Sequence, residues 1–182
     1  MSSPWRHPLE TALARNAPQV EVQVATVSPE AAPGVRTVVL RGFSFEGCPY
    51  FFTDLRSRKA RHLAENPKLE LHAWFPLTRE QFRLSGRATL HGRHAEGPWA
   101  ELRRRAWEGL EADARGPFLG PPPGRTLVAA PPVDELPPFP PQEFLVVSLE
   151  VTEADWLSLG PPPTRAGFRL LGAGWVQQPL TP

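Results

Sequence analysis

Hydrophobic and polar residues alternate along several short stretches of the chain, the period typical of half-buried strands. Val20, Val22 and Val24 alternate with polar residues. Turn-forming residues follow from 29 to 34, and a β-branched run then covers 35 to 40. Because a short turn between two such runs usually joins neighbouring antiparallel strands, the pattern predicts a hairpin.

The same reasoning predicts further strands down the chain. Residues 50–53 form a third strand, and residues 69–75 and 80–90 alternate with Leu69, Leu71, Ala73, Phe75, Phe82, Leu84 and Ala88 inward. Residues 143–151 are apolar almost throughout, which indicates a strand covered on both faces. A terminal hairpin is expected around Gly172 and Gly174. Six to eight strands with a few short flanking helices favour a mainly β fold, an antiparallel barrel.

Helical spacing is confined to three segments. Leu9, Ala12 and Leu13 predict a helix over 5–16. Residues 57–67 form a short helix in which Ser57 is the N-cap and Pro67 ends the segment. Residues 96–112 return to helical spacing, and Arg103, Arg104 and Arg105 lie mostly off its apolar stripe, so they are expected to form a solvated face.

A proline-rich segment spans residues 116–141 and holds ten of the 24 prolines. Proline removes backbone donors and disfavours helix interiors, so this segment is expected to be an ordered loop or strap within a single domain of residues 1–182. It is not a second domain.

Composition narrows the function classes. The net charge of +1 provides no field to hold nucleic acid. Cys48 is the only cysteine, which excludes an intrachain disulfide and suits a reducing compartment. Neither a long apolar run nor a secretory leader is evident, so no membrane partner and a cytoplasmic location are expected. His91 and His94 are too few to predict a metal site.

The helix over 57–67 has an unusual charge arrangement. Arg58, Lys59 and Arg61 lie in its first turn, where the helix dipole is already positive. Arg36 and Thr53 are brought near by the intervening turns, and together these groups suit a phosphate. The alternative is a solvated basic helix end, the commoner origin of a charge run.

The order of several motifs resembles the pyridoxamine 5'-phosphate oxidase family of FMN-binding split barrels. These motifs are RTVVLRGF from Arg36, FFT from Phe51, SRKA from Ser57, ENP from Glu65 and EQFRLSGRA from Glu80. The resemblance resumes at the C-terminus with TRAGFRL from Thr164 and GWVQQPLTP from Gly174.

The resemblance implies a split β-barrel that binds FMN at the interface of a homodimer. It implies that Ser57, the helix N-cap, and Arg36, Arg58 and Lys59 hold the phosphate, and that Thr53 with its neighbour Phe52 and the strand Thr37, Val38 and Val39 line the ribityl chain and ring. Gln81 would contact the ring, Trp156 and Arg165 would complete the site from the partner subunit, and Arg41 replaces a substrate-binding lysine. For Trp156, packing in the core is the alternative.

The chain also departs from the family pattern. The family's Arg-Leu-His-Asp segment is replaced by Pro161-Pro162-Pro163-Thr164, and its substrate-phosphate residues align near Trp107, Glu111 and Arg115. The leading hypothesis is an FMN-dependent oxidoreductase acting on a small organic substrate. A carrier or sensor without turnover, pyridoxamine or pyridoxine 5'-phosphate oxidase activity, and an interaction module built on the proline-rich segment are the alternatives.

Overall fold

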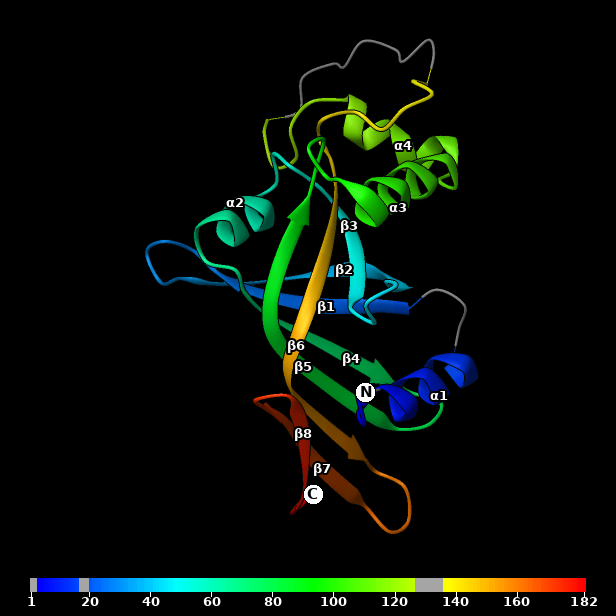
Figure 1. Ribbon diagram of the computed structural model, residues 1–182, viewed down its shortest axis with the longest axis vertical. Coiled ribbons are helices and arrows are strands. Elements are labelled where there is room, and N and C mark those ends of the chain that lie inside the picture. The colour runs from blue at the N-terminus through cyan, green and yellow to red at the C-terminus, as the bar shows by residue number, and fades with distance from the viewer. Residues whose placement is uncertain (1–2, 17–19, 127–135) are drawn as a thin grey trace.

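The computed structural model describes residues 3–16, 20–126 and 136–182, and this part of the chain is mainly antiparallel strands (Figure 1). The strands are β1 (Val20–Val27), β2 (Pro33–Phe43), β3 (Pro49–Asp54), β4 (Lys68–Phe75), β5 (Glu80–His91), β6 (Phe144–Ser158), β7 (Thr164–Leu171) and β8 (Gly174–Leu180). The helices are α1 (Arg6–Asn16), α2 (Arg58–Glu65), α3 (Gly97–Glu108) and α4 (Ala112–Leu119).

The first six strands close into a barrel. Their order is β3-β2-β1-β4-β5-β6, and β3 pairs again with β6, which joins the two ends of the sheet. On the edge away from β5, β6 pairs first with β3 and then with β7: Phe144–Ser148 pairs with β3, and Glu153–Ser158 pairs with β7. β7 and β8 therefore extend from the barrel as a hairpin (Figure 1). The predicted antiparallel barrel and terminal hairpin are confirmed.

Alternation along the strands separates a buried inner face from an outer face. Val22 pairs with Val38 and Ala73 pairs with Phe82, and all four side chains point into the barrel core. The residues predicted to point inward on β4 and β5 are all buried: Leu69, Leu71, Ala73, Phe75, Phe82, Leu84 and Ala88. Burial of these side chains supplies the main driving force for closing the barrel.

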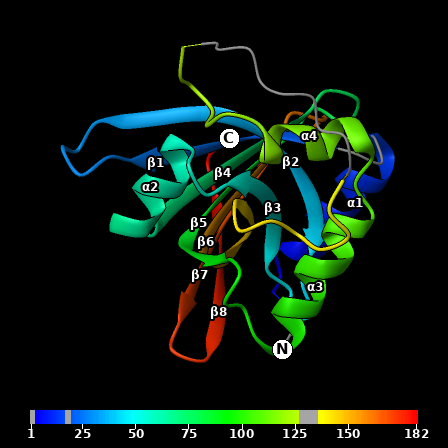
Figure 2. The ribbon, with the colours of Figure 1, turned by 90° about the horizontal axis from the view of Figure 1, so that it is seen from above.

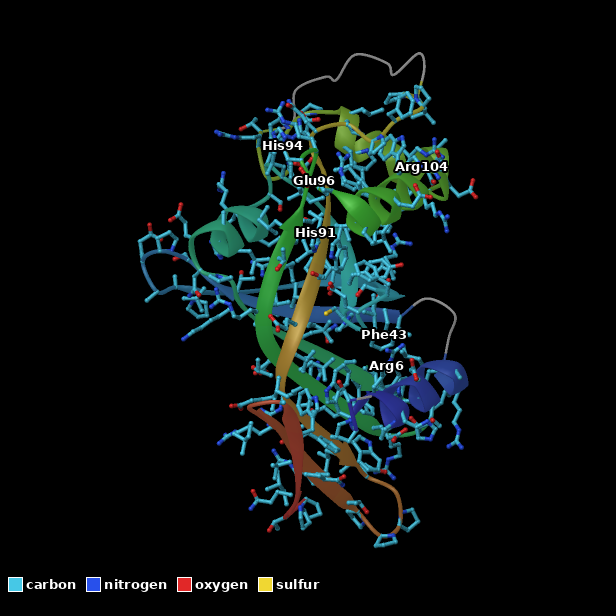
Figure 3. The ribbon with its side chains drawn as sticks, viewed as in Figure 1. Arg6, Phe43, His91, His94, Glu96 and Arg104 are labelled. Carbon is cyan, nitrogen blue, oxygen red and sulfur yellow. The ribbon has the colours of Figure 1, made fainter. Side chains whose placement is uncertain are left out.

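The predicted N-terminal helix covers one side of this core as α1. Leu9 and Ala12 are fully buried against the barrel, together with Trp5 just before the helix. The guanidinium of Arg6 lies 4.6 Å from the centre of the Phe43 ring, so a cation–π contact joins α1 to β2 (Figure 3).

A second hydrophobic cluster lies where α3 and α4 pack on the opposite end of the barrel (Figures 1 and 2). Trp107 of α3 and Phe144 of β6 are completely buried there, and Phe118 of α4 contacts Phe144 edge to face at 4.9 Å. These contacts fix the two helices against Tyr50 and Phe52 of β3, the strand that leads into the basic helix α2.

The prediction of a solvated arginine face on α3 is wrong for Arg103. This side chain is only 7% exposed. Its Nε donates to the carbonyl oxygen of Phe144 at 2.9 Å, and its Nη2 donates to that of Pro141. Its long stem lies along apolar surface while the guanidinium satisfies carbonyl groups, a use of arginine that helical spacing does not reveal. Arg104 and Arg105 instead pair with Glu101 at the surface.

The proline-rich segment is not all loop. α4 extends to Leu119 and contains Pro117, so residues 116–119 are helical, contrary to the prediction. The helix tolerates Pro117 because it is short and because packing of Phe118 against Trp107 and Phe144 holds it in place. Part of the predicted strap, residues 127–135, lies outside the described residues. Among the described residues, no helix is long and apolar enough to cross a membrane.

Candidate functional site

The basic helix α2 begins as the sequence predicts. Ser57 has extended backbone angles, and its hydroxyl accepts a hydrogen bond from the Ala60 backbone N–H at 3.3 Å. Its backbone N–H donates to the Asp54 carbonyl at 3.0 Å, so the cap is tied to the end of β3. This arrangement leaves the first backbone N–H groups of α2 directed toward the barrel end, where an anion is stabilised.

Lys59 turns back from α2 toward β3. Its Nζ donates to the Thr53 hydroxyl at 3.0 Å, and the Thr53 and Ser57 hydroxyls are 3.2 Å apart. Thr53 is 4% exposed and Ser57 5%. A buried pair of hydroxyls and a half-buried ammonium therefore converge, as the phosphate hypothesis requires.

Arg36 approaches the same place from β2. Its Nη1 donates to the Val24 carbonyl at 3.2 Å and to the Thr26 hydroxyl at 2.8 Å. The guanidinium also lies against Gly34, where an added Cβ would stand 2.9 Å from Nη2. A side chain at Gly34 would displace Arg36, so this glycine leaves the space that the guanidinium needs.

The cations of this site influence one another. Burial lowers the pKa of Lys59, and the positive charge of Arg36 lowers it further. Burial and Arg58 likewise lower the pKa of Arg36. Asp54 is the acid nearest to Lys59, but its carboxylate is already paired with Arg56 at 2.7 Å. In the described chain, the cations of the cluster have no carboxylate of their own, which favours a bound anion.

A pocket of about 250 Å³ adjoins Lys59. It is lined on the barrel side by Thr37, Val38, Phe52 and Thr53, and α4 with the following loop closes it with Pro117, Phe118 and Pro123. β2 pairs with β3 only from Leu40 to Phe43. On that side of β2, the backbone around Val38 therefore borders this pocket and has no neighbouring strand in the described part of the chain. The structure thus brings together most of the residues predicted for the phosphate and ribityl end.

Arg41 and Val39 lie on the outer face of β2, as does Thr37. The Arg41 guanidinium lies 5.0 Å from the centre of the Phe52 ring, and its buried Nε has no hydrogen-bond partner among the described residues. Arg41 is thus held on the aromatic face by a cation–π contact, without an acid partner among the described residues.

Gln81 and Arg165 lie apart from this cluster. They point to the outer face in one cross-strand row, in which Gln81 pairs with Leu157 and Leu157 pairs with Arg165. Arg165 forms an ion pair with Asp155 at 3.0 Å. Arg36 points to the inner face of β2, three strands from β5 in the order of the sheet. Within one chain the two groups do not converge.

The amide of Gln81 is held by a histidine on the neighbouring strand. His72 Nε2 is 3.3 Å from Gln81 Oε1, and His72 Nδ1 is 2.9 Å from Gln23 Oε1. The imidazole therefore lies between two side-chain amides, one on β1 and one on β5. His72 thereby orients the Gln81 side chain on the outer face.

Trp156 lies on the opposite face from Gln81 and Arg165. Its ring stacks on Phe82 with centroids 6.3 Å apart, and its Nε1 donates to the Glu80 carboxylate at 2.9 Å. The structure therefore places Trp156 at the edge of the barrel core and does not bring it to the other predicted residues.

Sequence reasoning missed three side chains around the cationic cluster. Thr26 contacts both His62 and Arg36, and Arg56 donates to the Gly120 carbonyl at 2.9 Å, which ties the α4 end to the loop before α2. The one available signal was His62, a polar residue next to Leu63 on the side of α2 that faces the barrel.

His91 and His94, which Figure 3 labels, each contact other side chains. The His91 ring stacks on Trp99 with centroids 3.7 Å apart, and its Nε2 is 2.9 Å from the Ser148 hydroxyl. His94 Nε2 accepts a hydrogen bond from Arg93. Cys48 lies in the turn before β3, and burial raises the pKa of its thiol, which makes it less reactive.

Residues 2–92 match the family model described as the FMN-binding domain of pyridoxamine 5'-phosphate oxidase. A pyridoxine/pyridoxamine 5'-phosphate oxidase 2 from Arabidopsis thaliana is 31% identical over 166 residues, covering 86% of this chain and 84% of the relative. A pyridoxine/pyridoxamine 5'-phosphate oxidase from a Nostoc species is 40% identical, but over only 43% of this chain and 36% of the relative.

Among solved structures, a pyridoxamine 5'-phosphate oxidase-related, FMN-binding protein from Nostoc punctiforme is similar along its whole length. It is 32% identical, covers 100% of both chains and superposes with a TM-score of 0.84. The fold is thus shared with a protein that binds FMN, and the segment matched by the family model contains Arg36, Thr53, Arg58 and Lys59.

Proposed function

The chain belongs to the FMN-binding pyridoxamine 5'-phosphate oxidase family, and from this membership we propose that it is an FMN-dependent oxidoreductase that acts on a small organic substrate. FMN is the cofactor of the family. The observation that carries the proposal is the group of Arg36, Arg58 and Lys59, cations that have no acid of their own among the described residues; burial and the charge of Arg58 lower the pKa of Arg36, and burial and the charge of Arg36 lower that of Lys59. Their charge and position suit the phosphate of the cofactor.

Each residue of the proposed site has a definite task. Lys59 and the Arg36 guanidinium neutralise the phosphate, the Thr53 and Ser57 hydroxyls donate to its oxygens, and the exposed Arg58 adds positive charge. Thr37 and Val38 line the ribityl chain and ring, and Phe52 supplies an apolar wall. Val39 does not line this pocket and instead borders a second one beside Trp74. When bound, FMN supplies the hydride or electron transfer, while the protein binds it, orients it and shields it from water.

We expect the protein purified from cells to carry the visible absorbance of oxidised flavin. The positive cluster should retain the cofactor, and stripped protein should quench the fluorescence of added FMN at a ratio of about one per chain. A colourless protein that neither quenches FMN fluorescence nor gains thermal stability from it would contradict the proposed site.

Turnover distinguishes an enzyme from a carrier or sensor. The carrier alternative is motivated by Pro161-Pro162-Pro163-Thr164, which contains none of the titratable side chains that usually act as general acid or base. Reduction of the bound flavin by a nicotinamide cofactor, followed by reoxidation coupled to loss of a substrate, supports the enzyme. Flavin that binds but stays oxidised under these conditions supports the carrier.

Pyridoxamine or pyridoxine 5'-phosphate oxidase activity is the second alternative. The residues that align with the family's substrate-phosphate group are already used within the structure. Trp107 is buried and donates its Nε1 to the Pro137 carbonyl, and Arg115 donates to the carbonyls of Glu108 and Leu110. Direct measurement of pyridoxal phosphate formation tests this activity, and its absence is expected.

We further propose a cytoplasmic, single-domain homodimer in which the partner copy completes each flavin site. The support is that Gln81 and Arg165 face away from the Arg36 cluster, and that the same outer face exposes apolar side chains. Val35 is 66% exposed, Trp74 41% and Val176 51%. An exposed apolar face of this kind suits a second copy.

Mixing two inactive variants tests the shared site. Arg36→Ala and Arg165→Ala homodimers should each bind FMN weakly, because every site lacks one arginine. Mixed dimers would contain one intact site, so co-refolding equal amounts should restore tight binding to about a quarter of the sites. If binding is not restored although the variants exchange subunits, both arginines act within one chain and the shared site is excluded.

A further inference from the structure

A buried chain of hydrogen bonds runs from α2 to the phosphate site. His62 Nδ1 is 3.0 Å from the Thr26 hydroxyl, and that hydroxyl accepts a hydrogen bond from Arg36 Nη1 at 2.8 Å. His62 is 6% exposed and Thr26 1%. The three side chains come from three elements, α2, β1 and β2, which meet at this end of the barrel.

The directions of these hydrogen bonds follow from the donor inventory. Arginine only donates, so Thr26 accepts from Arg36. The single hydrogen of the Thr26 hydroxyl then needs an acceptor, because an unpaired buried donor is costly. His62 Nδ1 is the acceptor within reach in the described chain. His62 is therefore the neutral tautomer with its proton on Nε2, and the residue also lines a pocket of about 540 Å³ beside α2.

Burial and the charged groups around His62 both affect the pKa of its imidazole. Burial lowers its pKa, and the positive charges of Arg36, Arg58 and Arg61 lower it further, whereas Glu30 in the β1–β2 turn opposes them. A neutral imidazole adds no fourth positive charge to the cluster, and its Nδ1 stays free to accept from Thr26.

We propose that Thr26 and His62 are positioning residues that hold the Arg36 guanidinium in place for the cofactor phosphate. The inference rests on the proposed FMN site and adds residues that the family motifs quoted above do not include. One Nη1 hydrogen bond to Thr26 and one to the Val24 carbonyl anchor one corner of the guanidinium. Nη2, packed against Gly34, keeps its N–H groups for the ligand. The guanidinium is thus oriented before the anion arrives, which reduces the entropy lost on binding.

The test compares Thr26→Val with Thr26→Ser. Valine keeps the shape but removes the acceptor, whereas serine keeps the hydroxyl. The dissociation constant of FMN, measured by fluorescence quenching of the stripped protein, should rise about tenfold for Thr26→Val and stay near the wild-type value for Thr26→Ser. His62→Leu should resemble Thr26→Val. Riboflavin, which lacks the phosphate, should bind all four proteins alike.

A double-mutant cycle separates positioning from a general structural effect. In an Arg36→Ala background, Thr26→Val should cause no further loss of FMN affinity, because the side chain that it orients is gone. Thermal unfolding without flavin checks that each variant is folded. Wild-type affinity in Thr26→Val, or the same loss with or without Arg36, would overturn the proposal. If wild-type protein itself binds no FMN, the proposed site fails instead.

Discussion

Replacement of Lys59 by alanine is expected to raise the dissociation constant of FMN by roughly a hundredfold, since a charge-assisted hydrogen bond in a partly buried site is worth up to about 3 kcal/mol. The Nζ of Lys59 donates to the Thr53 hydroxyl in a partly buried position, where both burial and the charge of Arg36 lower its pKa. Isothermal titration of the stripped protein with FMN measures the effect.

The chain offers a matched control, because its only other lysine is Lys68, an exposed residue at the start of β4. Lys68→Ala makes the same chemical change outside the site, and its affinity for FMN should stay within about twofold of the wild-type value, since exposed charges contribute little. An equal loss in both variants would mean that net charge alone governs binding. Wild-type affinity in Lys59→Ala would exclude Lys59 from the phosphate site.

The Lys59→Ala substitution should weaken FMN binding without lowering the stability of the flavin-free protein. The folded protein lowers the pKa of Lys59, so folding disfavours its charged form, and this destabilisation is present at every pH below the folded-state pKa. Lys59→Ala removes the destabilisation. Without FMN, its melting temperature should therefore equal or exceed that of the wild type, whereas with saturating FMN the wild type should gain more.

The strands were predictable wherever burial alternates. β1, β4 and β5 each have one face in the core, so Val22, Leu71 and Leu84 mark their inner side in the sequence itself. β6 was predicted only to Val151, yet it continues to Ser158. Its second half pairs with β7, and that pairing depends on contacts between distant residues that a local pattern does not record.

The phosphate end of the site was predictable from the sequence because its parts are local. Ser57 caps α2, Lys59 follows two residues later, and Thr53 is the last residue but one of the preceding strand, so their convergence requires only one turn. The link from His62 through Thr26 to Arg36 spans three elements and depends on how α2 packs on β1. Threonine in a strand and histidine in a helix are common, so neither residue alone predicts a role in the site.

Arg103 and Trp156 show where side-chain direction decides the outcome. The charge of Arg103 predicts that its side chain is exposed to solvent, but buried carbonyls at and just before the start of β6 require donors, and its guanidinium supplies them. Trp156 lies next in the chain to Leu157, which faces outward with Gln81, and strand alternation therefore directs Trp156 to the other face. A one-residue difference in register determines whether such a side chain reaches a ligand.

Gly86→Ala should destabilise the fold by about 3 kcal/mol or more, the range of the severest packing changes. A Cβ at this position would stand 1.9 Å from the carbonyl oxygen of Glu150 and 3.0 Å from the Cα of Val151. Both are backbone atoms of β6 and cannot rotate away. The register between β5 and β6 shifts at this point, between Ser85 and Gly86, so the two strands approach each other without a side chain between them.

Gly174→Ala is the matched control for this change. Gly174 begins β8, and nothing lies within 4 Å of a Cβ added there. Gly174→Ala should therefore change the free energy of unfolding by no more than about 0.5 kcal/mol. Urea unfolding followed by circular dichroism compares the two variants. Because β5 also carries Gln81, a folded fraction of Gly86→Ala should show altered flavin absorbance, whereas Gly174→Ala should not. Equal midpoints for Gly86→Ala and the wild type would mean that β5 and β6 are not this close in solution.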